Sequence, residues 1–133
     1  MSSILNHIGN TPLVPLARLS KSVGRMIYGK CEHMNPGGSV KDRSARAIID
    51  QAEKEGLIQP GGTIIEATAG NTGVGLALVS AIRGYRLICV MPEKMRGEKC
   101  RALEAMGAEV VMTENAPPGD PRNFQQVAKR LSE

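Results

Sequence analysis

The apolar positions of this chain follow two spacings that predict alternating strands and helices. Three short, mainly apolar runs have the length of buried strands: 63–67, 86–91 and 109–113. Four longer segments carry apolar residues at helical spacing: 40–52, 74–83, 98–106 and 122–132. Strands that are apolar on both faces and alternate with helices are typical of a parallel sheet with right-handed crossovers. The pattern predicts an α/β fold with a doubly wound parallel sheet.

Residues 4–17 at the beginning of the chain do not follow this alternation. Residues 4–17 mix apolar side chains with Gly9, Pro12 and Pro15, which interrupt regular hydrogen bonding and predict an extended arm or an edge strand. Residues 25–32 contain a short apolar run that predicts one strand. The sequence therefore predicts an arm followed by a strand–helix rhythm that repeats about four times, with residues 25–32 as its first strand.

Composition narrows the class of protein. The net charge is +4 with both signs interleaved, and two tyrosines and one phenylalanine are the only aromatic residues, which argues against a nucleic-acid surface. The start lacks a signal-peptide pattern, and no apolar run reaches the length of a membrane span. The three cysteines and two histidines are widely spaced, which favours neither disulfides nor a metal site. We expect a soluble, cytoplasmic protein with no nucleic-acid, membrane or metal partner.

Residues 35–43 are the strongest candidate for chemistry. Asn-Pro-Gly-Gly predicts a tight turn, Ser39 is a favourable N-cap, and Asp42 completes an approximate capping box. Lys41 then lies in the first helical turn, where the helix dipole disfavours a second positive charge and partial burial would act in the same direction. A neutral lysine is a nucleophile for a carbonyl compound or a pyridoxal cofactor. The alternative is a solvated lysine on a charged first turn.

Residues 70–75 form a glycine-rich loop that follows a predicted strand and opens an apolar helix. With Glu93 about twenty residues further on, the layout is close to a dinucleotide-binding motif, although the order of the glycines differs. The loop and the two residues before it carry Thr68, Asn71 and Thr72 at a helix N-terminus, and together these make a receptor for a carboxylate or phosphate. A turn that only packs the helix on the strand is the third interpretation.

Three motifs together resemble the cysteine synthase and cystathionine β-synthase family. They are Ile-Gly-Asn-Thr-Pro-Leu-Val at 8–14, Asn-Pro-Gly-Gly-Ser-Val-Lys-Asp-Arg at 35–43 and Thr-Ala-Gly-Asn-Thr-Gly at 68–73. Their order and spacing match the family, and the resemblance covers essentially the whole chain. It implies a pyridoxal-phosphate enzyme with the tryptophan-synthase-β-like architecture, fold type II.

The resemblance implies a role for each candidate residue. Lys41 is similar to the lysine that forms a Schiff base with pyridoxal 5'-phosphate, and Asn71 to the residue that hydrogen-bonds the phenolic oxygen of the cofactor. The segment 68–72 resembles the loop that closes over the substrate α-carboxylate. Its residues are Thr68, Ala69, Gly70, Asn71 and Thr72. The implied reaction is β-replacement on a small amino acid by sulfide or a thiol. O-acetylserine and sulfide give cysteine, or serine and homocysteine give cystathionine, and the family implies a homodimer.

Two departures from the family pattern qualify these roles. Ala69 stands where the family usually has serine, which removes a hydroxyl contact to the carboxylate. The family's glycine-rich phosphate loop and the hydroxyl partner of the pyridine nitrogen have no match here. We therefore expect the N-terminal portion of a longer enzyme, with residues 1–38 as arm and strand of the larger domain and 39–133 as the lysine helix and the smaller parallel α/β domain. A dinucleotide-binding domain and a catalytically inert fragment stay open as alternatives.

Overall fold

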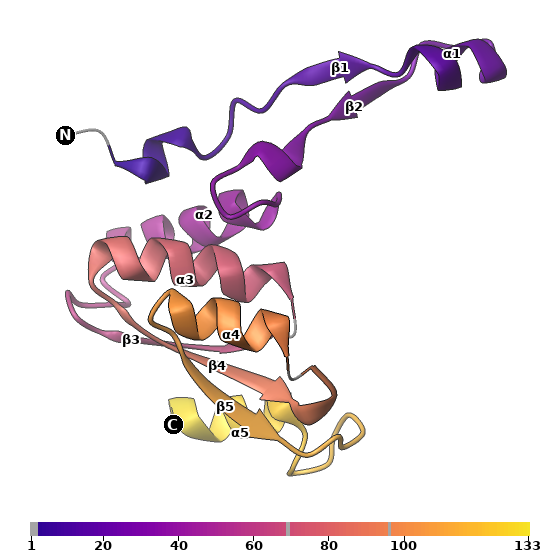
Figure 1. Ribbon diagram of the computed structural model, residues 1–133. Helices are drawn as coiled ribbons and strands as arrows, with labels where there is room; N and C mark the ends of the chain where they lie inside the picture. The colour runs from indigo at the N-terminus through magenta and orange to yellow at the C-terminus, as the bar shows by residue number, and fades with distance from the viewer. Residues whose placement is uncertain (1–2, 69, 96) are drawn as a thin grey trace.

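A three-stranded parallel sheet is the centre of the fold (Figure 1). The structure, a computed structural model, describes residues 3–68, 70–95 and 97–133. The strands are β3 (Thr63–Ala67), β4 (Arg86–Pro92) and β5 (Glu109–Thr113). They lie in sequence order with β4 in the middle, and the register pairs Ile65 with Ile88 and Val90 with Val111. Because the strands are parallel, their carboxyl ends lie along one edge of the sheet.

The two faces of β4 contribute to two different apolar cores. Leu87, Cys89 and Met91 are buried in the core made with α3 (Asn71–Arg83) and α4 (Glu98–Ala105). Ile88 and Val90 lie on the opposite face, in the core made with α5 (Phe124–Ser132). Side chains of a strand alternate between faces, so the continuous apolar run of β4 reflects cover on both sides. Burying each large side chain fully contributes roughly 1.5–3 kcal/mol.

The helix α2 (Lys41–Lys54) packs on α3 and not on the sheet. Its buried residues Ala45 and Ile49 belong to the same core as Leu76 and Val79 of α3. Figure 1 shows α3 between α2 and the sheet. Helix α2 is therefore held in place through α3, which follows the first strand of the sheet.

Residues 3–34 form an arm that extends away from the sheet (Figure 1). Strands β1 (Leu13–Pro15) and β2 (Tyr28–Lys30) pair antiparallel and are joined by α1 (Ala17–Val23). Short 3₁₀ helices are η1 (Ile4–His7), η2 (Glu32–Met34) and, after β4, η3 (Glu93–Met95). Apolar side chains of the arm such as Leu13, Leu19 and Met26 are exposed. Leu5 of η1 is an exception, because it is buried in the core that α2 and α3 share, so apolar packing holds the start of the arm while its β1–α1–β2 part presents exposed apolar side chains.

The predicted fold class is confirmed, and the three predicted sheet strands agree with β3, β4 and β5. The strand expected at 25–32 does not join the parallel sheet: β2 pairs antiparallel with β1 in a separate two-stranded sheet. It is also shorter than predicted, because Pro12 and Pro15 opposite it lack the N–H groups that would lengthen the ladder. Helix α1 was not predicted, since Ser20 is its only buried residue and no apolar face signals it.

Two helix starts also differ from the prediction. Helix α3 begins at Asn71 and not at 74, with Gly70 in the N-cap position. Helix α5 begins at Phe124 and not at 122, because the Asn123 side chain accepts a hydrogen bond from the Gln125 N–H and caps the helix there.

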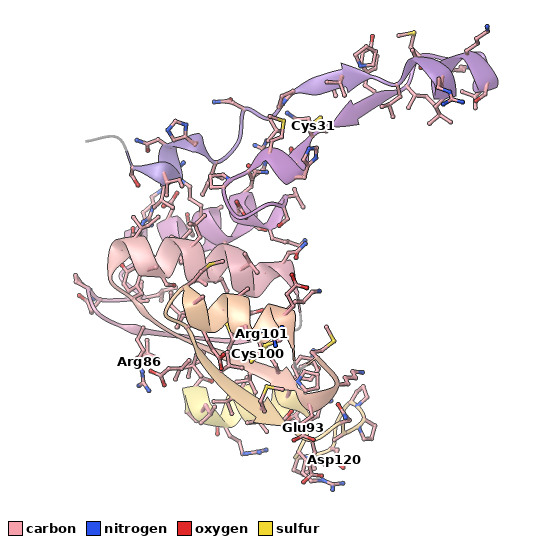
Figure 2. All side chains as sticks on the ribbon, viewed as in Figure 1. Cys31, Arg86, Glu93, Cys100, Arg101 and Asp120 are labelled. Carbon is pink, nitrogen blue, oxygen red and sulfur yellow. The ribbon has the colours of Figure 1, made fainter. Side chains whose placement is uncertain are left out.

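The three cysteines form no disulfide among the described residues and lie on separate parts of the fold. Cys31 directly follows β2, whereas Cys100 lies on α4 (Figure 2). Burial raises the pKa of the Cys89 thiol to about 12, with the nearby Glu66 carboxylate acting in the same direction, so this thiol stays protonated. Within the described residues, no three His, Cys, Asp or Glu side chains gather as a metal site. Across the same residues, no helix combines the length and apolar character that a bilayer span requires.

Candidate active site

The N-terminal ends of α2 and α3 lie side by side at the carboxyl edge of the sheet. Gly75 of α3 allows the close approach: a Cβ there would lie 2.8 Å from the Lys41 carbonyl oxygen and 3.0 Å from the Ala45 Cβ. At the other end of the pair, Arg83 Nη1 donates to Glu53 Oε2 at 2.9 Å. The two helices therefore run parallel, and their positive dipole ends favour an anionic ligand at the same place.

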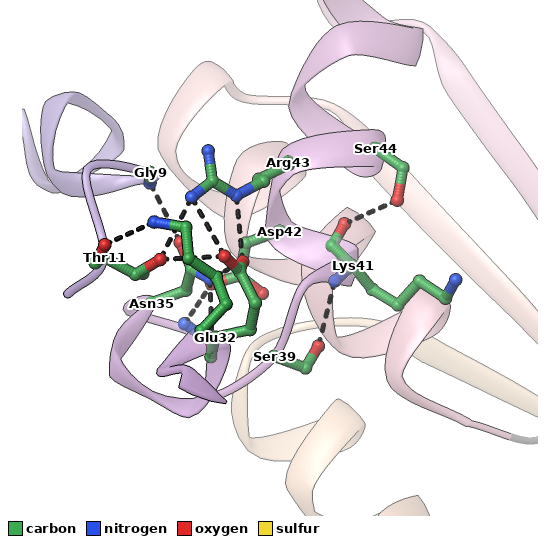
Figure 3. A network of polar contacts seen from close by, with 11 residues as sticks. Gly9, Thr11, Glu32, Asn35, Ser39, Lys41, Asp42, Arg43 and Ser44 are labelled. Carbon is green, nitrogen blue, oxygen red and sulfur yellow. Dashed lines mark hydrogen bonds and ion pairs between the residues drawn. The ribbon is translucent and has the colours of Figure 1, made fainter. Parts of the chain in front are cut away.

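Lys41 is the first residue of α2, and its side chain is exposed. Its backbone N–H donates to Ser39 Oγ at 3.1 Å, while its ammonium group has no hydrogen-bond or ion-pair partner among the described residues (Figure 3). The partial burial considered for Lys41 is not observed, because its side chain is exposed. What the structure provides is an amine at a positive helix end that no neighbouring carboxylate engages.

The predicted Asn-Pro-Gly-Gly turn precedes α2, but the predicted capping pattern is wrong. Ser39 lies before the N-cap position, where its hydroxyl accepts the Lys41 N–H. Asp42 completes no capping box, because its Oδ2 accepts a hydrogen bond from the Gly37 N–H instead. A Cβ at Gly37 would lie 2.5 Å from Asp42 Oδ1, so only glycine allows the turn to approach this closely.

The Asp42 side chain is fully buried beneath this turn. Burial raises the pKa of its carboxyl group, and its Oδ1 has no hydrogen-bond partner among the described residues. A buried acceptor without a partner costs about 1–3 kcal/mol. Asp42 therefore holds the turn against α2 at a cost in stability, which is typical of functional sites.

The second predicted site element is the loop before α3. Thr68 is buried, and its Oγ1 accepts a hydrogen bond from the Gly70 N–H at 3.2 Å. Asn71 is exposed at the start of α3, and Thr72 is half-buried. Gly70 occupies the N-cap position without a side-chain bond, so N–H groups of the first turn are left for a ligand. Ala69, the remaining residue predicted for this loop, lies outside the described residues.

Two of the three glycines in residues 70–75, Gly73 and Gly75, have packing roles. A Cβ at Gly73 would lie 2.7 Å from Thr68 Cγ2, and one at Gly75 would meet the Lys41 carbonyl oxygen. These two glycines bring α3 against the preceding loop and against α2. The packing interpretation therefore accounts for both of them without a dinucleotide.

A polar network that the sequence did not predict lies on the other side of the α2 first turn (Figure 3). Glu32 is at its centre: Oε1 accepts from Thr11 Oγ1 at 2.7 Å, and Oε2 accepts from Arg43 Nε at 2.8 Å. Asn35 Nδ2 donates to Glu32 Oε2 at 2.9 Å, and Asn35 Oδ1 accepts from the Gly9 N–H at 2.8 Å. We call Thr11, Glu32, Asn35 and Arg43 the Glu32 network. Hydrogen bonds from Arg43, and then from Thr11, lower the pKa of Glu32 to about 2, so its carboxylate is ionised at neutral pH.

Part of the signal for this network was present in the sequence. Thr11, Asn35 and Arg43 lie within the two motifs at 8–14 and 35–43. Glu32 lies in neither motif. Only the folded chain shows that its carboxylate accepts hydrogen bonds from all three of them.

The described residues fit an aldehyde cofactor that carries an anionic group. An amine without a partner, as at Lys41, is what a carbonyl compound requires for covalent attachment. The paired helix N-termini favour a carboxylate or phosphate, and the exposed Asn71 amide adds a donor beside them. Pyridoxal phosphate combines an aldehyde with a phosphate, so its chemistry suits this edge of the sheet.

Comparison with known proteins supports the same cofactor. The family model described as "Pyridoxal-phosphate dependent enzyme" matches residues 4–133. Cystathionine beta-synthase from Apis mellifera is 56% identical over 115 residues, which cover 85% of this chain and 23% of that protein. Cysteine synthase 1 from Neurospora crassa is 48% identical over 126 residues, which cover 95% of this chain and 34% of that protein.

Solved structures agree with the sequence relatives. A hydrogen sulfide-producing enzyme from Fusobacterium nucleatum matches with a TM-score of 0.85 and 40% identity, over 99% of this chain and 42% of that one. This chain thus spans less than half the length of these relatives. Because the family model matches nearly every residue, the chain belongs to the family of pyridoxal-phosphate-dependent enzymes.

Proposed function

We propose that this chain carries the cofactor lysine and the substrate loop of a β-replacement enzyme that makes cysteine. O-acetylserine and sulfide are the proposed substrates, and cysteine and acetate are the products. The observation that carries the proposal is that Lys41, whose amine has no partner among the described residues, packs its backbone carbonyl against Gly75 in the N-terminal part of α3. A relative named cysteine synthase supports it.

Lys41 has two tasks in this proposal. Its Nζ would hold the cofactor covalently, and when it is not engaged in that bond it would accept the proton from the substrate α-carbon. The cofactor, when bound, withdraws electrons from that carbon and so makes the proton acidic enough to be removed. The exposed position of Lys41 at the end of α2 leaves its side chain free to move between these two tasks.

The loop before α3 orients the substrate in this proposal. N–H groups in the first turn of α3 donate to the α-carboxylate, and the hydroxyl of Thr72 together with residues 68–70 completes the receptor. Asn71 donates its side-chain amide to the phenolic oxygen of the cofactor. Buried Thr68, which accepts the Gly70 N–H, fixes the shape of the loop. The loop therefore supplies orientation, while Lys41 supplies proton transfer.

Cystathionine formation from serine and homocysteine is the second candidate. It is supported by relatives named cystathionine beta-synthase at 56% and 52% identity. The two candidates differ in the acceptor, a sulfide in one and a larger thiol in the other. Product analysis with each donor and acceptor in competition separates them.

The role of Lys41 is tested by spectroscopy on the intact protein. We expect a visible absorption band from lysine-bound pyridoxal phosphate that is absent in Lys41→Ala. The matched control is Lys54→Ala, which removes the lysine at the other end of the same helix and should leave the band unchanged.

Two outcomes would contradict this proposal, and a third would exclude one of its alternatives. A band that persists in Lys41→Ala shows that another residue binds the cofactor. Tight binding of a dinucleotide without a response to pyridoxal phosphate favours the dinucleotide-binding alternative on residues 70–75. Cysteine formation by the 133-residue chain alone excludes a catalytically inert fragment.

We also propose where the chain belongs in the intact enzyme. Residues 1–38 are assigned to the larger domain and 39–133 to the smaller one, which is supported by the exposed apolar side chains of the arm. A homodimer in the cytoplasm is the proposed state of the protein. Limited proteolysis that first cuts near residue 38, together with the mass in solution, tests the division and the oligomer.

A further inference from the structure

The Glu32 carboxylate uses all of its hydrogen-bonding capacity. Arg43 donates twice, from Nε to Oε2 at 2.8 Å and from Nη2 to Oε1 at 3.1 Å. Thr11 and Asn35 donate the other two bonds, at 2.7 and 2.9 Å. A carboxylate offers about four lone-pair sites, and a bidentate guanidinium pair fixes direction as well as distance. Such an arrangement holds its members in one geometry.

The two uncharged residues of the network, Thr11 and Asn35, are also shielded from water. Thr11 is 7% exposed and Asn35 is 4% exposed, while the Glu32 side chain is 22% exposed. Both apolar cores are built from other residues. The network therefore contributes little to the sheet, and its bonds act on the segments that lead into α2.

Lys41 and Arg43 lie on opposite sides of the first turn of α2. Two residues apart in an α-helix are separated by about 200° around its axis. Figure 3 shows the Lys41 side chain directed away from the Glu32 network. Any rotation or shift of this turn that breaks the Arg43 bonds therefore moves the Lys41 amine as well. Buried Asp42, bonded to Gly37, holds the turn from a third side.

We propose that the Glu32 network positions Lys41. Through Arg43 and Asn35 it fixes the first turn of α2, so that the Lys41 amine meets the cofactor carbonyl in the reactive orientation. This inference rests on the proposed role of Lys41. Glu32 and Arg43 are positioning residues that act through Lys41.

The chain offers a matched control at the opposite end of the same helix. There Glu53 accepts hydrogen bonds from Arg83 and from Tyr85, so it also pairs a carboxylate with an arginine and a hydroxyl. Glu53→Gln and Glu32→Gln remove the same charge from the same kind of cluster. They differ in the distance of that cluster from Lys41.

The experiment compares these two variants in the intact protein after its cofactor is removed. Backbone hydrogen exchange at residues 37–41 reports the order of the turn without any cofactor. Pyridoxal phosphate is then added, and borohydride trapping measures how fast the Lys41 peptide becomes labelled. We expect Glu32→Gln to accelerate the exchange and to lower the limiting labelling rate roughly ten- to a hundredfold, with the half-saturating cofactor concentration little changed. Glu53→Gln should stay within about twofold of the wild type on both measures.

Each result decides the inference. Labelling of Lys41 in Glu32→Gln at the wild-type limiting rate overturns the positioning role while the proposed function stands. Absence of Lys41 labelling in the wild type overturns the proposed function and this role with it. If Glu32→Gln does not fold, Arg43→Lys replaces it, because it keeps the charge and loses the bidentate geometry. A wild-type labelling rate in Arg43→Lys also overturns the role, and a lowered rate at an unchanged melting temperature supports it.

Discussion

The two ends of α2 are held by polar clusters of the same chemistry, but only one of them adjoins the candidate site. The N-terminal end has the Glu32 network. At the C-terminal end, Arg83 donates to Asp50 and Glu53, and Tyr85 Oη donates to Glu53 Oε1 at 2.7 Å. We call these four residues the Arg83 cluster. Each cluster pairs an arginine with carboxylate oxygens and adds a hydroxyl donor.

The clusters differ in what else holds their residues. The Arg83 cluster joins two helices that already pack through buried Ala45 and Ile49, and the Asp50 side chain is 46% exposed. The Glu32 network joins the arm to the turn before α2, and none of its four residues belongs to an apolar core, although Leu5 of the arm is buried in one. Exposed ion pairs between elements that are already ordered contribute about 0–1 kcal/mol. An ion pair therefore has more consequence at the N-terminal end, where it determines the course of the backbone.

The largest effect is expected from Gly75→Ala, which separates the N-terminal ends of α2 and α3 and leaves the Arg83 cluster in place. The added Cβ would lie 2.8 Å from the Lys41 carbonyl oxygen, a backbone atom that has little room to move. Overpacking of this kind costs about 1–3 kcal/mol, offset in part by the higher helix propensity of alanine. Urea unfolding of the intact protein measures the loss.

Gly70→Ala is the control for Gly75→Ala. Its added Cβ meets no described atom within 4 Å, and its φ of −148° is open to any residue. We expect its stability to change by no more than about 0.5 kcal/mol. Equal stabilities for the wild type and Gly75→Ala would show that the helix ends are not in close contact.

Local signals made much of the fold and part of the site predictable. The strands β3, β4 and β5 were found because apolar runs bounded by glycine or proline are local patterns. The turn before α2 was found for the same reason, since Asn-Pro-Gly-Gly disfavours both helix and strand. This turn alone places Lys41 at the start of its helix, without any information on tertiary contacts.

Features that depend on distant contacts were not predictable. Thr11 bonds Glu32 and Arg43 across 21 and 32 positions of sequence, so the Glu32 network exists only once the arm has its path. The capping error has a similar cause. Asp42 accepts the Gly37 N–H instead of the N–H that a capping box would give it, and this bond forms only when the turn at 35–38 folds back on α2.

A smaller effect is expected at the other end of α2. A double-mutant cycle of Asp50→Ala and Arg83→Ala should give a coupling energy of about 0.2–1 kcal/mol, because both side chains keep contact with water. The coupling should weaken at high salt. The exposed pair Arg86–Glu109 on the sheet (Figure 2 labels Arg86) is the reference, at the lower end of that range. A coupling well above the range would mean that the C-terminal cluster orders the chain as strongly as the N-terminal one.

Two opposite pH trends are expected at the N-terminal end of α2. The pKa of Glu32 is lowered from 4.5 to about 2, so its contribution is complete above pH 4.5 and is lost as the pH falls towards 2. The pKa of Asp42 is raised from 3.8 by burial, so its ionisation favours unfolding as the pH rises above 3.8. Melting temperatures between pH 2 and 7 should show Glu32→Gln converging with the wild type as the pH falls. Asp42→Asn should gain relative to the wild type as the pH rises, since its side chain does not ionise. Parallel curves for Glu32→Gln and the wild type would mean that the Glu32 carboxylate is not held by the network, and the contrast between the two ends of α2 would disappear.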